Sequence, residues 1–127
     1  MKTIEQRRLE ILNDTVRYYS ENPKERRCVS NLQCRYSGET LGKNTEGCGI
    51  GRLLTLEQRN YLDDKYPEGE SVANIFEELP KGVQRLGVDF LSDLQQLHDR
   101  QNCWDEFSIT RQGVEAVEKI KKIYCGL

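Results

Sequence analysis

Residues 28–54 read CVSNLQCRYSGETLGKNTEGCGIGRLL, and their pattern differs from that of the chain on either side. Apolar residues alternate loosely with polar ones over 29–36. The run 37–47 is polar and rich in residues that favour turns, and apolar residues return over 48–54. Two short alternating segments joined by a polar connection predict a small antiparallel β-hairpin over about 28–54.

Helical patterns flank this stretch on both sides. A Thr-x-x-Gln capping box at Thr3 predicts a helix over about 3–21, in which apolar residues recur every three to five positions. A second capping box at Thr55 opens a helical remainder over 55–127. We therefore expect an α+β fold, a single and mainly helical domain with four to five helices and one small antiparallel β-hairpin.

Composition narrows the class of protein. The 127 residues include 19 Lys+Arg and 21 Asp+Glu, and this slightly acidic balance argues against a dedicated nucleic-acid binder. No apolar run approaches the roughly 18 residues of a membrane span, and the first residues have no apolar signal core. We expect a cytoplasmic protein without a membrane partner. Hydrophobic residues make up only 36%, so a homodimer that shares apolar surface is one possibility.

Glycines at alternate positions, Gly47, Gly49 and Gly51, form the most unusual local feature. Consecutive backbone amides in such a loop can surround an anion, and the guanidinium of Arg52 would add donors for phosphate or carboxylate. The alternative interpretation is structural: a tight strand packs against a helix where a larger residue would clash.

The single histidine, His98, falls on the apolar face of a predicted helix and is followed by Asp99. A thiol such as Cys48 beside this imidazole would form a nucleophile–base pair, with Asp99 orienting the ring. That arrangement is the basis of the alternative that the protein is a cysteine-dependent hydrolase or transferase. The competing interpretation is a histidine at the edge of the core, bonded to a backbone carbonyl.

A zinc-stabilised structural module is a further alternative. Cys34, Cys48, His98 and Cys103 are residue types that bind zinc tetrahedrally. The chain has no Cys-x-x-Cys pair, and the spacings of its five cysteines do not match a zinc finger or ribbon. Reduced, buried thiols without any cofactor are the simpler interpretation.

Several of these residues also form a pattern that resembles a group of small bacteriophage and bacterial proteins with no established activity. The pattern, over about residues 34–99, is Cys-x-Tyr, then Cys-x-Ile-Gly, then a Gly-x-Ser-Val helix start, then Leu-Gln-x-x-His-Asp. Gly49 stands where the group commonly has alanine. The resemblance implies a phage or mobile-element origin. It singles out six residues: Cys34, Tyr36, Cys48, Gly51, His98 and Asp99.

We therefore expect a non-enzymatic accessory protein that binds a host partner protein or a small anionic, nucleotide-like ligand. The expected ligand-binding residues are Gly47, Gly49, Gly51, Arg52, Tyr36 and His98. The cysteine enzyme and the zinc module remain alternatives, and their common requirement is that Cys48 and His98 meet in three dimensions.

Overall fold

The computed structural model describes residues 2–27, 29–30, 33–34, 36, 48–67 and 70–127. The secondary-structure elements within these ranges are, in order, α1 (Ile4–Glu21), α2 (Pro23–Arg26), β1 (Val29–Ser30), β2 (Gln33–Cys34), η2 (Gly51–Leu53), α3 (Leu56–Lys65), α4 (Val72–Ile75), η3 (Phe76–Glu78), α5 (Lys81–Gln84), α6 (Val88–Asp99), η4 (Gln101–Cys103) and α7 (Arg111–Tyr124). The η elements are short 3₁₀ helices.

Three of the long helices begin at threonine caps, which satisfy backbone amides that have no partner inside the helix. At the start of α1, the Thr3 hydroxyl accepts from the Gln6 amide at 3.1 Å, and the Gln6 side chain accepts from the Thr3 amide at 2.8 Å. Thr55 and Gln58 form the same capping box at α3. Thr110 accepts from the backbone of α7. Both capping boxes predicted from the sequence are therefore confirmed.

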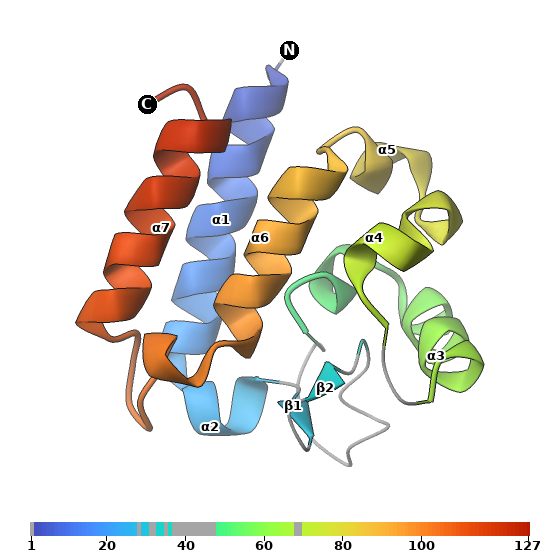
Figure 1. Ribbon diagram of the computed structural model, residues 1–127, viewed down its shortest axis with the longest axis horizontal. Coiled ribbons are helices and arrows are strands. Elements are labelled where there is room, and N and C mark those ends of the chain that lie inside the picture. The colour runs from blue at the N-terminus through green and yellow to red at the C-terminus, as the bar shows by residue number, and fades with distance from the viewer. Residues whose placement is uncertain (1, 28, 31–32, 35, 37–47, 68–69) are drawn as a thin grey trace.

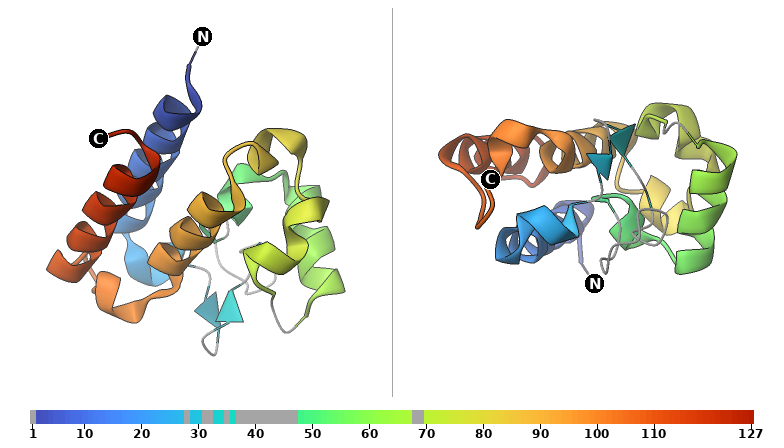
Figure 2. Two further views of the ribbon diagram at one scale, coloured as in Figure 1. Left: turned by 45° about the horizontal axis from the view of Figure 1, so that its top comes forward. Right: turned by 90° about the horizontal axis from the view of Figure 1, so that it is seen from below.

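The helices form two groups (Figure 1). Helices α1, α6 and α7 lie side by side, and α7 contacts both of the others. Helices α3, α4 and α5 lie on the far side of α6 from α7, and α4 packs against α6 (Figure 2). Because α6 touches both groups, it is the central helix of the structure.

The predicted α+β class is wrong, because the described residues form a helical fold without the predicted hairpin. Residues 48–54 make a turn followed by η2. The Arg52 amide donates to the Cys48 carbonyl at 3.1 Å, and the Leu54 amide to the Gly51 carbonyl at 3.0 Å. These local bonds occupy backbone groups that a strand would offer to a partner. The remaining pairing, two residues of β1 with two of β2, is too short to form a sheet with a hydrophobic face.

The core lies around α6 and extends into both helix groups. Phe90, Leu91 and Leu94 are fully buried on this helix. At the C-terminal end of α6, the Tyr19 ring meets the His98 ring edge-on, with the ring centroids 4.9 Å apart. The Tyr19 ring also meets the Trp104 ring edge-on, with the centroids 6.0 Å apart. Among the described residues, no helix has the length and apolar character needed to cross a bilayer.

Candidate functional site

The glycine-rich segment packs directly on α6. A Cβ atom placed on Gly49 would lie 3.4 Å from both the His98 Cβ and the Leu94 carbonyl oxygen. The next amide, that of Ile50, donates to the Gln95 side chain at 3.2 Å. The structure therefore brings Gly49 and His98 together, as part of a buried contact. Gly47 lies outside the described residues.

Gly51 makes an even closer contact, with Tyr36. A Cβ on Gly51 would lie 2.0 Å from the Tyr36 carbonyl oxygen, so only glycine allows the two backbones to approach this closely. Tyr36 is held from two sides, because its amide donates to the Asp63 carboxylate at 2.9 Å and its hydroxyl to the Glu70 carbonyl at 2.9 Å. Both Gly51 and Tyr36 are buried.

Arg52 points back to α1. Its guanidinium forms an ion pair with Asp14 at 2.7 Å and stacks over the Tyr18 ring, 4.1 Å from the centroid. Only 10% of the Arg52 side chain is exposed. The hydrogen bonds from Arg17 and Arg52 hold the pKa of Asp14 below its usual range. The donors that an anion would need are thus already engaged in joining η2 to α1.

His98 belongs to a polar network inside the core. Its Nδ1 lies 2.7 Å from the Asp99 carboxylate, and the same carboxylate oxygen accepts from Gln95 at 2.9 Å. Arg27 donates to the backbone carbonyls of His98 and Asp99, at 2.7 and 2.9 Å. The imidazole is fully buried. The network joins α6 to Arg27, directly after α2, and to the glycine segment through the bond from Ile50 to Gln95.

The Cys48 thiol is also fully buried. Its sulfur accepts from the Gly51 amide at 3.4 Å, which closes the turn at the start of η2. The thiol and the imidazole belong to neighbouring segments, but neither is exposed to solvent, so the described geometry offers a substrate no access to the pair. The catalytic role of Cys48, His98 and Asp99 remains a prediction without geometric support.

The zinc alternative gains no support from the described residues, which contain no group of three or more His, Cys, Asp or Glu side chains able to hold a metal ion. The Cys34 side chain lies outside the described residues. Cys103 is buried, and burial raises the pKa of its thiol. A raised pKa disfavours the thiolate that binds zinc, so metal binding also remains a prediction.

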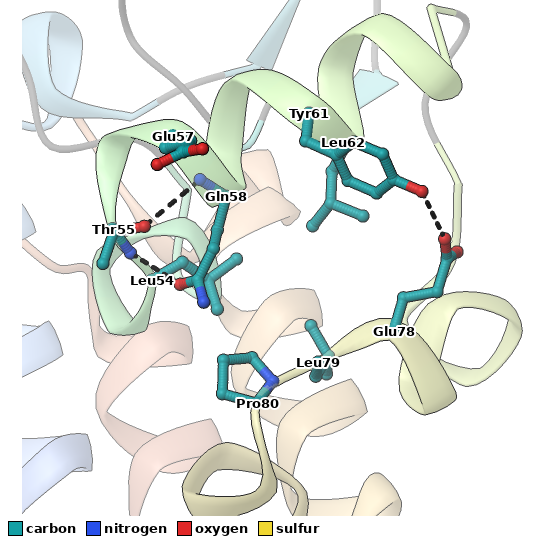
Figure 3. Close-up of a pocket in the computed structure, with 9 residues that line it drawn as sticks. All are labelled: Leu54, Thr55, Glu57, Gln58, Tyr61, Leu62, Glu78, Leu79 and Pro80. Carbon is teal, nitrogen blue, oxygen red and sulfur yellow. Dashed lines mark hydrogen bonds between the residues drawn. The ribbon is translucent and has the colours of Figure 1, made fainter.

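A surface groove lies between α3 and the segment that joins η3 to α5 (Figure 3). It encloses about 500 Å³. Nine residues line it: Leu54, Thr55, Glu57, Gln58, Tyr61, Leu62, Glu78, Leu79 and Pro80. We call it the α3 groove. Leu54, Leu62 and Leu79 form its buried apolar floor, while the Tyr61 ring on its rim is 54% exposed.

One end of the α3 groove is fixed by the Glu78 carboxylate. It accepts from the Tyr61 hydroxyl at 3.2 Å, from the Tyr66 hydroxyl at 2.5 Å and from the Lys65 ammonium at 2.5 Å. The bond from Lys65 is the main reason that the pKa of Glu78 is lowered. The same carboxylate raises the pKa of Lys65 and of Tyr66. These bonds tie α3 to η3, so the groove is preformed.

No residue of the α3 groove was predicted from the sequence to bind a ligand or partner, although Thr55 was predicted as a helix cap. Tyr61 and Leu62 are adjacent apolar residues in one predicted helix, and their spacing does not show that one is exposed and the other buried. The pairing of Tyr61 with Glu78, 17 positions later, has no sequence signal.

Comparisons with known proteins do not add to this description. No protein-family model, no curated protein and no solved structure matches the chain. The resemblance to the phage and bacterial group, and the origin that it implies, therefore remain predictions.

Proposed function

We propose that this protein is a non-enzymatic binding module that holds a short segment of a partner protein in the α3 groove. The observation that carries the proposal is the groove itself, a preformed concave surface with an apolar floor and an exposed aromatic ring on its rim. A volume of about 500 Å³ falls within the range of roughly 300–1,000 Å³ that is usual for binding pockets.

The composition of the rim supports a protein partner. Tyrosine is enriched in protein interfaces because its ring buries a large apolar area while its hydroxyl stays polar. An accessory role in a phage or mobile element would fit such a module.

The burial of the other candidate residues supports the same proposal. The described part of the glycine segment lies in the core, and Arg52 is paired with Asp14. The α3 groove does not favour a small anionic ligand, because the acidic side chains Glu57 and Glu78 line it. Of the two expected binding partners, a partner protein is therefore better supported than a small anionic ligand.

Selection from a random peptide library against the full chain tests this proposal. We expect enriched peptides that bind with micromolar affinity. Their affinity for the Tyr61→Ala variant should be lower by at least about tenfold, a loss typical of an aromatic residue in an interface. Val114→Ala, which removes an exposed apolar side chain from α7, is the matched control and should leave affinity unchanged. Failure to enrich any peptide, or equal binding to Tyr61→Ala, would contradict the proposal.

A further inference from the structure

The charges that line the α3 groove have one sign. Glu57 and Glu78 are among its lining residues, and no lysine or arginine is. The two carboxylates differ in what they already bind. Glu78 accepts hydrogen bonds from three donors, including the Lys65 ammonium, so its charge is largely compensated.

Glu57 is the carboxylate left to recognise an occupant. It is exposed in the first turn of α3, and among the described residues no hydrogen bond or ion pair involves its side chain. The cation nearest to it in the sequence is Arg59, whose guanidinium donates to the Leu54 carbonyl at 3.2 Å and does not line the groove. The groove therefore combines an apolar floor with one carboxylate that no side-chain cation among the described residues pairs with.

We infer that the partner segment places an arginine or lysine side chain in the α3 groove, with its charged end at Glu57 and its methylene stem on Leu54 and Leu62. This inference rests on the proposed function. Arginine and lysine suit such a site because their stems cover apolar surface while their charged ends remain solvated. A carboxylate at the same place would face Glu57 without a compensating cation, so the groove discriminates against acidic segments.

Three matched peptides test the inference on the full chain: acetyl-Leu-Arg-Leu-amide and its versions with glutamine or glutamate in the central position. The measurement is a titration followed through the backbone amide NMR signals. We expect the arginine peptide to shift the signals of residues 54–62 and 78–79. It should bind about three- to fivefold more tightly than the glutamine peptide, the gain typical of a solvent-exposed charge pair. The glutamate peptide should bind more weakly than both.

Two variants assign the preference to Glu57. Glu57→Gln should bring the arginine and glutamine peptides to within about twofold of each other, because it removes the charge and keeps the size. Asp64→Asn removes an exposed carboxylate of the same helix that does not line the groove, and the preference should survive.

The outcomes separate this inference from the proposed function. Equal binding of all three peptides in the groove, or a preference that persists in Glu57→Gln, would overturn the inference and leave the groove as the binding surface. If none of the peptides shifted the signals of residues 54–62 or 78–79, both the inference and the proposed function would be contradicted.

Discussion

The contact between Gly51 and Tyr36 makes a strong prediction about stability. In Gly51→Ala the new Cβ would lie 2.0 Å from the Tyr36 carbonyl oxygen and 2.9 Å from the carbonyl carbon. Real Cβ atoms do not approach backbone this closely, so one of the two segments must move. Overpacking of a core typically costs about 1–3 kcal/mol.

The displaced residue makes the cost larger. If Tyr36 moves, its amide loses its hydrogen bond to the Asp63 carboxylate. Asp63 is buried, with only 6% of the residue exposed. A buried acceptor that loses its donor costs about 1–3 kcal/mol more. We therefore expect Gly51→Ala to lower the free energy of unfolding by about 3 kcal/mol, a large part of the stability of a domain of this size.

Urea denaturation followed by far-UV circular dichroism measures this loss. Gly82→Ala is the matched control, because Gly82 lies in α5 and a Cβ there has nothing within 4 Å. The control should gain up to about 1 kcal/mol through the higher helix propensity of alanine. A free energy of unfolding for Gly51→Ala within about 0.5 kcal/mol of the parent would refute the reasoning.

Three further predictions concern Arg52, Asp14 and the buried thiols. Arg52→Ala should lose about 1–2 kcal/mol of stability in urea, since it removes a cation–π contact and an ion pair whose arginine side chain is only 10% exposed. Arg17→Ala, at a side chain that is 59% exposed, should lose less, and equal losses would contradict this. Because the pKa of Asp14 is lowered on folding from its ordinary value of 3.8, its stabilisation is complete above about pH 5 and is lost as pH falls through the folded-state value. Asp14→Asn should therefore flatten the acid limb of a melting-temperature profile, and an unchanged acid limb would count against the pairing. Cys48 and Cys103 should not react with iodoacetamide until the protein unfolds, since both are buried, and mass spectrometry can map the labelled sites. Rapid labelling of Cys48 in the native protein would favour the alternative that the protein is a cysteine-dependent enzyme.

The helices could be predicted from the sequence because their signals are local. Thr3 and Thr55 each lie three positions before the glutamine that completes the capping box, and both boxes are present in the structure. The hairpin prediction was wrong because the shape of residues 48–54 depends on contacts with distant parts of the chain. Gly49 packs on α6, and Gly51 packs on Tyr36. Gly49 and Gly51, which look strand-like in the sequence, thus pack against distant residues around a turn.

The candidate binding residues could not be assigned from the sequence either, because their roles also depend on contacts with distant parts of the chain. Their spacing could not show that Arg52 would pair with Asp14, 38 positions earlier, instead of facing a ligand. The close packing expected of a structural glycine segment occurs at Gly51, but the expected strand does not form there, because residues 51–53 are a 3₁₀ helix. The α3 groove depends on the tertiary pairing of Tyr61 with Glu78. A binding surface formed in this way has no local sequence signature.

Hydrogen–deuterium exchange of the full chain, with and without a saturating library-selected peptide, tests the location of the binding surface most directly. Our account predicts new protection over residues 54–62 and 78–79, where the α3 groove lies. Protection confined to residues 48–52 and to α6 around His98 would contradict it, and would return the binding role to the glycine segment.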